Sequence, residues 1–165
     1  MKKEIRAGVL TISDKGAKGL REDESGKIIL QILEEFGLKA VKKEIIPDDL
    51  QQIVDTLIMW VDKDGLALII TSGGTGLSPT DVTPQAMEQV IDYQVPGMAE
   101  AMRAASLKKT PHAMISRAMA GVRNSSLIIN LPGSPRGAEE NLSVVLPALD
   151  HDLLKLAGDT TDCAV

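Results

Sequence analysis

A chain of 165 residues, of which 44% are hydrophobic and 25% charged, has the size and composition of a folded globular domain rather than of a disordered segment. The net charge of −5, the lack of any basic run longer than two residues and the presence of one Phe, one Tyr and one Trp argue against nucleic-acid binding. The single cysteine, Cys163, excludes an internal disulfide and fits a reducing compartment, so we expect a cytoplasmic protein. No apolar run approaches the roughly 20 residues of a membrane span, and the one that ends at Ser13 is too short for a signal peptide.

The first half of the chain alternates between short apolar segments and amphipathic ones. Short segments rich in Ile, Leu and Val predict strands at residues 5–13, 39–46 and 66–70. Apolar residues at helical spacing predict one helix from about Gly26 to Gly37 and another within residues 46–65. The polar, glycine-containing segment 14–25 is expected to be a loop.

The second half is richer in predicted helix. Prolines suited to a first helical turn open two predicted helices, at 84–94 and 96–108, and a short third helix is expected at 113–120. Residues 126–130 read as a strand. Apolar residues then mark a long helix over 135–156, which Pro147 should kink or break in two. We expect residues 1–158 to form a single domain and 159–165 to form a flexible tail.

This alternation predicts an α/β fold, a three-layer sandwich with a mostly parallel central sheet and helices on both faces. In such sheets, ligands bind outside the carboxyl ends of the strands. Three turn-rich segments follow predicted strands and should meet at that edge: ISDKG (12–16), TSGGTG (71–76) and NLPGSP (130–135). We therefore expect the functional site there.

The segment TSGGTGLSPTDVTP (71–84) has two possible interpretations. Its glycines could leave backbone N–H groups open to an anion beside a helix N-terminus, which would make a phosphate-binding turn. It matches neither standard motif, because no lysine follows Gly76 as in a P-loop, and Pro79 occupies the third glycine position of a dinucleotide fingerprint. Alternatively, it is only a tight strand-to-helix turn, with Thr83 as N-cap and Pro84 in the first helical turn.

The aspartates near this edge are equally ambiguous. Asp81 could form a local Asx-turn, or it could hold Mg²⁺, which proteins commonly bind through one or two carboxylates plus substrate phosphates. Asp48 and Asp49 stand where an N-cap is expected, and for them the capping interpretation is the stronger. Because both loops should lie at one sheet edge, two carboxylates could face one phosphate chain.

Other reactive residues lack a supporting pattern. His112 and His151 have no metal-ligand spacing and are expected to be surface or hydrogen-bonded histidines. Ser106 could be a catalytic hydroxyl, but no His–Asp context for a hydrolase triad accompanies it.

Four segments in this order carry a family resemblance: GVLTISD, IPDD, TSGGTGLSPTDVTPQAM and ASLKKTPHAMISRAMAGVRNSSLIINLPGSPRGAEENL. Together they resemble the molybdopterin adenylyltransferase family (Mog/MoaB), including the related domain of gephyrin, over nearly the whole chain to about residue 158. The resemblance implies a compact three-layer α/β fold, usually a homotrimer. It also implies Mg²⁺-dependent transfer of AMP from ATP to the phosphate of molybdopterin, with release of pyrophosphate, and hand-over of the product to a molybdenum insertion protein.

The resemblance also implies roles for particular residues. The two essential aspartates of the family fall on Asp48 and Asp81, as catalytic residues and Mg²⁺ ligands. The substrate-binding positions fall on Ser13, Asp14, Gly73, Gly74, Thr75, Gly76, Ser106, Gly133 and Ser134. Many members carry Arg immediately before the second aspartate, where this chain has Thr80, so one phosphate contact is in doubt. A non-catalytic molybdopterin-binding or scaffold protein is the alternative, and the intact aspartates favour the enzyme.

Overall fold

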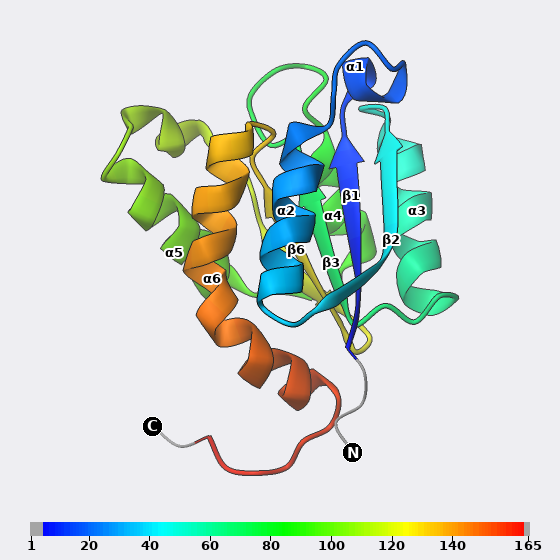
Figure 1. Ribbon diagram of the computed structural model, residues 1–165, viewed down its shortest axis with the longest axis vertical. Coiled ribbons are helices and arrows are strands. Elements are labelled where there is room, and N and C mark those ends of the chain that lie inside the picture. The colour runs from blue at the N-terminus through cyan, green and yellow to red at the C-terminus, as the bar shows by residue number, and fades with distance from the viewer. Residues whose placement is uncertain (1–4, 164–165) are drawn as a thin grey trace.

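In the computed structural model, which describes residues 5–163, a six-stranded sheet lies between two layers of helices (Figure 1). The strand order is β2-β1-β3-β6-β5-β4. The first four of these strands are parallel, whereas β5 pairs antiparallel with β6 and β4 pairs antiparallel with β5. The strands are β1 (Arg6–Ile12), β2 (Lys39–Ile46), β3 (Leu68–Ser72), β4 (Tyr93–Gln94), β5 (Ala120–Arg123) and β6 (Ser126–Leu131). The predicted mostly parallel sheet is confirmed.

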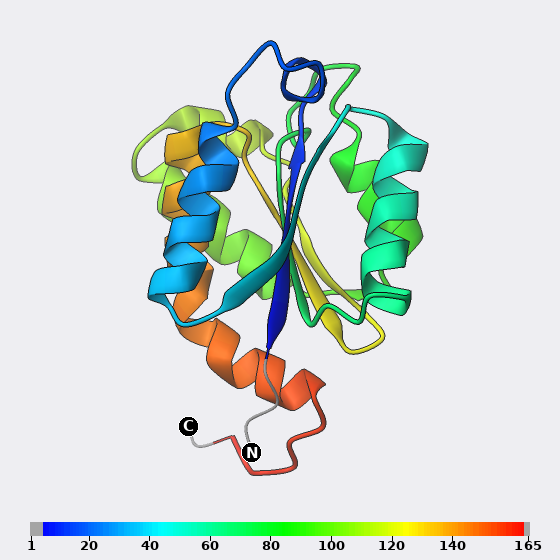
Figure 2. The same ribbon diagram turned by 45° about the vertical axis from the view of Figure 1, so that its right-hand side comes forward.

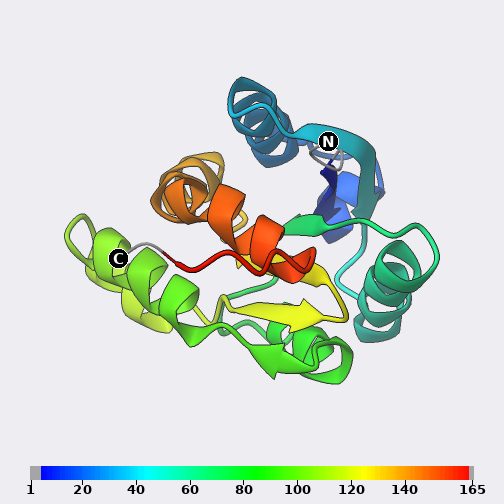
Figure 3. The same ribbon diagram turned by 90° about the horizontal axis from the view of Figure 1, so that it is seen from below.

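Helices cover both faces of this sheet, as Figure 2 shows with the sheet seen nearly edge-on. One layer contains α2, α5 and α6, in which α6 packs between the other two (Figure 3). The other layer contains α3 and α4, which pack against each other. The helices are α1 (Asp14–Ala17), α2 (Glu24–Glu35), α3 (Leu50–Asp62), α4 (Thr83–Val90), α5 (Pro96–Leu107), the 3₁₀ helix η1 (Pro111–Ile115) and α6 (Pro135–Leu156). The predicted three-layer architecture is therefore confirmed.

Two apolar clusters, one on each face, make the core. Successive strand residues point to opposite faces, so that Val9 belongs to the cluster under α2 and α6 and Leu10 to the cluster under α3 and α4. Both side chains are fully buried. Burial on both faces explains why the central strands are continuous apolar runs. It also fixes the carboxyl ends of β1, β3 and β6 at one edge, at the top of Figure 1.

Several predicted boundaries are wrong. Part of the predicted loop 14–25 forms the one-turn helix α1, and the predicted helix 84–94 ends at Val90 because Tyr93 and Gln94 pair with β5. In place of the predicted helix 113–120, the chain forms η1 and then turns into strand β5. Pro147 does not break α6, which is one helix of 22 residues that bends in its lower half (Figure 1). Within residues 5–163, no helix is both long and apolar enough to cross a bilayer.

Candidate active site

A cavity of about 660 Å³ opens at the carboxyl edge of the sheet. The loops that follow β1, β2, β3 and β6 meet there, as the alternating pattern predicts. Seven of the predicted site residues line it: Ser13, Asp48, Gly73, Gly74, Asp81, Gly133 and Ser134. Residues more than 100 positions apart in the chain thus share one site.

The structure distinguishes between the two neighbouring aspartates, Asp48 and Asp49. Asp49 is the N-cap of α3, because its backbone is extended and its carboxylate accepts a hydrogen bond from Gln52 N–H at 2.8 Å. Asp49 is exposed, whereas Asp48 is half-buried and lines the cavity. The capping interpretation of Asp48 is therefore wrong, and its carboxylate is free for another role.

Asp14 fixes the position of Asp48. Asp14 N–H donates to Asp48 Oδ2 and Asp48 N–H donates to Asp14 Oδ1, both at 3.0 Å. Burial raises the pKa of the Asp48 carboxyl above its ordinary value. The hydrogen bond from Asp14 N–H opposes that rise, and the negative charges of Asp14 and Asp81 add to it. Asp14 therefore contributes to the site by orienting the Asp48 side chain. A bound cation would stabilise the ionised form of the Asp48 carboxyl.

Asp81 lies on the loop between β3 and α4. Its Oδ2 accepts Ser78 N–H at 3.0 Å, and its own N–H donates to Ser78 C=O at 2.9 Å. The predicted local turn is thus present, and the same carboxylate lines the cavity. The two interpretations of Asp81 do not exclude one another, because one hydrogen bond leaves most of the acceptor capacity of a carboxylate unused.

The turn requires glycine at positions 73, 74 and 76, because neighbouring atoms lie too close to leave room for a Cβ. Gly73 has φ +104°, and a Cβ there would lie 2.2 Å from Ile12 C=O. Gly74 has φ +68°, and a Cβ would lie 2.3 Å from Thr83 Oγ1 and 3.3 Å from Asp48 Oδ1. A Cβ at Gly76 would lie 2.8 Å from Asp81 Oδ2. Both carboxylates therefore lie directly against the glycine turn.

The turn also has donors available for an anion. Within the described residues, the N–H groups of Gly74, Thr75 and Gly76 donate to no protein acceptor. Thr83 is not the N-cap of α4, as the turn interpretation required. It is the first helical residue, fully buried, and its hydroxyl donates to Gly73 C=O at 2.9 Å. The threonine hydroxyl is thus used to hold the glycine turn.

Two helix N-termini and several charged side chains complete the cavity. Asp23 caps α2 and Ser134 caps α6, and both residues line the cavity. Helix N-termini favour anions. The charged side chains of the lining, however, are five carboxylates and one guanidinium: Glu22, Asp23, Glu24, Asp48, Asp81 and Arg21. Ion pairs with Lys27 and Lys43 offset the charges of Glu22 and Asp23, which leaves the Asp48–Asp81 side of the cavity acidic.

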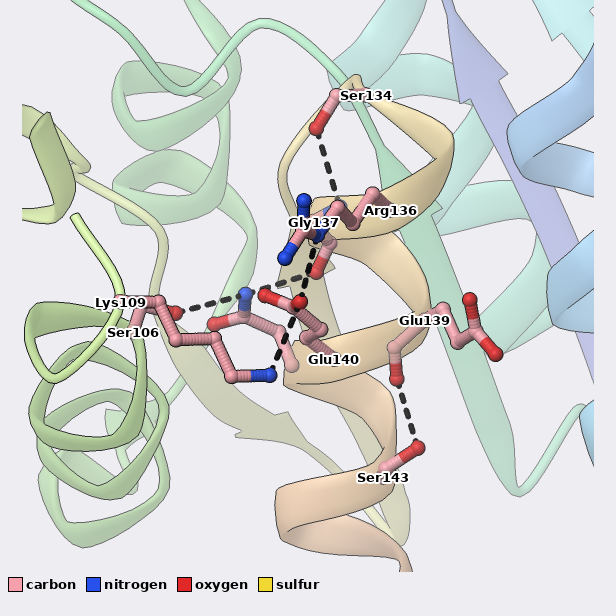
Figure 4. A network of polar contacts seen from close by, with 9 residues as sticks. Ser106, Lys109, Ser134, Arg136, Gly137, Glu139, Glu140 and Ser143 are labelled. Atoms are coloured by element: carbon pink, nitrogen blue, oxygen red, sulfur yellow. Dashed lines mark hydrogen bonds and ion pairs between the residues drawn. The ribbon is translucent and has the colours of Figure 1, made fainter.

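Three predicted site residues lie in a smaller neighbouring cavity of about 270 Å³. Thr75, Gly76 and Ser106 line it, and Ser134 lines both cavities. Asn141 holds Ser106, because its Nδ2 donates to Ser106 Oγ at 3.2 Å and to Gly137 C=O at 2.8 Å. An ion pair between Lys109 and Glu140 joins the same segment to α6 (Figure 4). Ten of the eleven predicted site residues therefore line two adjoining cavities, and Asp14, which lines neither, contacts Asp48 instead.

Sequence reasoning missed Asn141 and Arg117. Asn141 is buried on α6 and orients Ser106, and Arg117 binds the carbonyls of the loop that carries Asp81. Both lie in the segments that carry the family resemblance, which is the one signal that could have pointed to them. His112 and His151 are both exposed, as expected, although His112 reaches the rim of the smaller cavity.

The carboxylates fit a cation that is shared with a ligand. Within residues 5–163, no group of three or more His, Cys, Asp or Glu side chains could enclose a metal ion. Asp48 and Asp81 supply oxygen donors against Gly74 and Gly76 of the glycine turn, which suits Mg²⁺ bound by two carboxylates together with phosphate oxygens.

Comparisons with known proteins show the family to which this chain belongs. The family model described as "Probable molybdopterin binding domain" matches residues 8–151. The molybdopterin adenylyltransferase of Helicobacter pylori is 44% identical over 149 residues, which are 89% of this chain and 85% of that protein. The crystal structure of the molybdopterin biosynthesis enzyme MoaB from Thermus thermophilus superposes with a TM-score of 0.89 at 47% identity, over 94% of this chain and 98% of that one. The tungsten cofactor synthesizing protein MoaB of Pyrococcus furiosus superposes with a TM-score of 0.84 at 32% identity, over 96% of this chain and all of the other. The chain belongs to the molybdopterin-binding domain family of cofactor biosynthesis.

Proposed function

We propose that this chain is a molybdopterin adenylyltransferase, which transfers AMP from ATP to the phosphate of molybdopterin and releases pyrophosphate. The observation that carries the proposal is the meeting of Asp48 and Asp81 at a glycine turn with unused N–H donors. The similarity to curated molybdopterin adenylyltransferases over most of the chain supports it. A scaffold protein with no turnover would not need two partly buried carboxylates in an open cavity.

The reaction needs positioning and charge neutralisation more than proton transfer. An oxygen of the molybdopterin phosphate attacks the α-phosphorus of ATP, and the bond from that phosphorus to the bridging oxygen breaks as pyrophosphate leaves. A phosphate monoester is largely ionised at pH 7, so that the nucleophile requires no general base. This accounts for an active site without a catalytic His or Cys. The chain's task is to hold two anionic reactants together.

The acidic lining supports a divalent cation as part of the site. A triphosphate would be repelled by Asp48 and Asp81 unless a cation lay between the carboxylates and the phosphates. We propose that Asp48 and Asp81 are the ligands of Mg²⁺. When bound, Mg²⁺ would neutralise phosphate charge and act as a Lewis acid on the reacting phosphate. The N–H groups of Gly74, Thr75 and Gly76 would donate hydrogen bonds to phosphate oxygens.

The two cavities suit the two substrates. We assign the larger cavity, which contains the carboxylates, to ATP. The smaller one combines hydrogen-bonding groups such as Ser106, Arg103 and Asn141 with apolar groups such as Ile115 and Pro132, which suits a flat heterocycle. Molybdopterin bound there would direct its phosphate past Ser134, the residue that both cavities share.

The family resemblance supports three further proposals: a homotrimer, a cytoplasmic location and delivery of the product to a molybdenum insertion protein. Sedimentation tests the first, and a monomer at micromolar concentration would contradict it.

Incubation of the purified protein with molybdopterin, ATP and MgCl₂ tests the proposed function. We expect pyrophosphate release that stops when EDTA is added and resumes with excess MgCl₂. A protein that retains molybdopterin through gel filtration but releases no pyrophosphate would be the scaffold instead. Pyrophosphate release that EDTA leaves unchanged would support the adenylyltransferase activity but would refute the proposed Mg²⁺ site.

A further inference from the structure

The loop that carries Asp81 contains no regular structure of its own. Residues 77–80 are exposed, and the side chain of Leu77 is 64% exposed. Asp81 is joined to this loop by its two hydrogen bonds with Ser78, which is itself exposed. These local bonds shape the turn around Asp81, but they do not fix the turn relative to Asp48. Thr83 donates to Gly73 C=O and Gly74 C=O and so holds the base of the loop, and a further contact holds the segment that carries Asp81.

Arg117 makes that contact. Its Nε donates to Gly76 C=O at 2.9 Å and its Nη2 donates to Asp81 C=O at 2.7 Å. One planar guanidinium thus joins the two ends of the loop, and its third nitrogen, Nη1, donates to Gln85 on α4 at 3.2 Å. The backbone N–H of Arg117 also donates to Thr75 C=O at 2.8 Å. Arg117 therefore donates hydrogen bonds to the loop on both sides of its exposed residues 77–80.

Arg117 stands on a fixed segment. The adjacent residues Ala118 and Met119 are buried, and Asn130 N–H on β6 donates to Met119 C=O at 2.9 Å. From α5, Arg103 Nη1 donates to Ala118 C=O at 2.7 Å. The position of the guanidinium is therefore determined by the sheet and by α5, rather than by the exposed loop that it binds.

We infer that Arg117 is a positioning residue for the reaction, which holds the Asp81 loop so that the Asp81 carboxylate faces Asp48. The inference rests on the proposed role of Asp81. Arg117 lines neither of the two substrate cavities, and its three guanidinium nitrogens already donate to protein acceptors. Its effect on turnover is thus indirect. Lysine cannot replace it, because a single ammonium does not present a planar fork to two carbonyls.

The test compares wild type with Arg117→Lys, Asp81→Asn and the double variant, and uses Arg6→Lys as a matched control. Arg6 also donates from its guanidinium to a backbone carbonyl, that of Asp64, at 2.8 Å. It lies at the start of β1, at the opposite end of the strand from the site. Turnover, thermal melting and chymotryptic cleavage after the exposed Leu77 are measured on each preparation.

We expect Arg117→Lys to lower turnover about tenfold to a hundredfold, the range that small misplacements of reacting groups produce. Cleavage after Leu77 should accelerate at least about fivefold while cleavage at other exposed sites, such as Leu20 and Tyr93, keeps its wild-type rate, and Arg6→Lys should match wild type in both measurements. The double variant should turn over no more slowly than Asp81→Asn, because the two changes remove one function.

Three results would overturn the inference. Wild-type turnover in Arg117→Lys would show that a positive charge suffices. Losses that multiply in the double variant would show that Arg117 acts independently of Asp81. Cleavage that accelerates at many sites as well as after Leu77 would show that Arg117 stabilises the whole fold rather than the loop. By contrast, undiminished turnover in Asp81→Asn would refute the proposed role of Asp81. In that case, cleavage that is faster only after Leu77 in Arg117→Lys would still show that Arg117 holds the loop.

Discussion

The backbone amides of Asp14 and Asp48 each donate a hydrogen bond to the carboxylate of the other residue, and both N···O distances are 3.0 Å. This exchange joins the segment after β1 to the segment after β2. It uses Oδ2 of Asp48 and leaves Oδ1 directed at the glycine turn, 3.3 Å from the position of a Cβ on Gly74. Asp14 thus orients the second oxygen of Asp48 toward the place where a shared cation would bind.

Replacement of Asp48 by asparagine removes the negative charge of the side chain but keeps its size and shape. The amide oxygen of the new side chain can still accept the Asp14 N–H, but the negative charge is lost. We expect Asp48→Asn to lower turnover at least about a hundredfold, which is the scale of losing a charge-stabilising group at a transition state. Pyrophosphate release and thermal melting are measured on the same preparation, and melting should not fall by more than a few degrees.

Asp49→Asn is the matched control for this variant. Asp49 caps α3, and asparagine caps a helix about as well as aspartate. Both turnover and melting of Asp49→Asn should therefore stay close to wild type. Equal losses of turnover in the two variants would mean that the structure assigns the neighbouring aspartates wrongly.

The raised pKa of Asp48 gives the stability a distinct pH dependence. Burial is the main cause, with smaller contributions from the charges of Asp14 and Asp81. A carboxyl with a higher pKa in the folded than in the unfolded chain binds its proton more tightly when folded. Its ionised form therefore lowers stability at neutral pH, and this cost disappears as the pH falls to the ordinary aspartate value of about 3.9.

Without divalent cations, Asp48→Asn should thus melt above wild type at pH 7. The difference should shrink as the pH is lowered toward about 4. Calorimetry in EDTA between those limits checks this. A wild type that is the more stable protein at pH 7, or a difference that does not change with pH, would show that Asp48 carries no such cost.

Gly73→Ala should destabilise the protein more than Gly37→Ala. Both glycines have positive φ, +104° and +85°, but a Cβ at Gly37 meets no atom within 4 Å, whereas one at Gly73 would lie 2.2 Å from Ile12 C=O. We expect a cost of about 1–2 kcal/mol at Gly37 from the conformation alone. At Gly73 we expect about 1–3 kcal/mol more, because the backbone must move. Urea unfolding measures both, and equal midpoints would mean that the contact with Ile12 is not present.

Ser106→Ala should weaken binding of molybdopterin rather than of ATP. Ser106 Oγ accepts from Asn141, so its own hydrogen can be donated into the smaller cavity. Loss of one hydrogen bond of about 1 kcal/mol should raise the KM for molybdopterin roughly fivefold. Ser143→Ala is the control, because Ser143 donates to Glu139 C=O on α6 and lines neither cavity (Figure 4). A raised KM for ATP with an unchanged KM for molybdopterin would reverse the assignment of the cavities.

The central strands could be predicted because burial on both faces forces continuous apolar runs, as in residues 68–70 of β3. β4 and β5 could not, because a strand of two residues and one of four carry too little pattern, and they form through their partners. That α6 continues as one helix through Pro147 likewise depends on its surroundings, which no local pattern records.

The sequence predicts which edge of the sheet and which loops form the site, but it does not predict the contacts between the site residues. Asp48 and Asp49 are the same residue type in adjacent positions, and only the extended backbone of Asp49 makes that residue the cap. Arg117 and Asn141 act on backbone carbonyls and on one hydroxyl, and such contacts leave no spacing rule in the sequence. Ser106 was assigned to the same site as Asp48, and only the structure shows that a second cavity holds it.

The most direct test of the account is formation of adenylylated molybdopterin by Asp81→Asn, measured by mass spectrometry with saturating ATP and MgCl₂. Thr80→Ala is the control, because Thr80 is exposed on the same loop and lines neither cavity. We predict product from Thr80→Ala within about twofold of wild type. From Asp81→Asn we predict less than about 1% of the wild-type rate, with melting little changed, because a charge-stabilising group is lost at the transition state. Product formation by Asp81→Asn within a few-fold of wild type would show that the Asp81 carboxylate is not needed for adenylyl transfer.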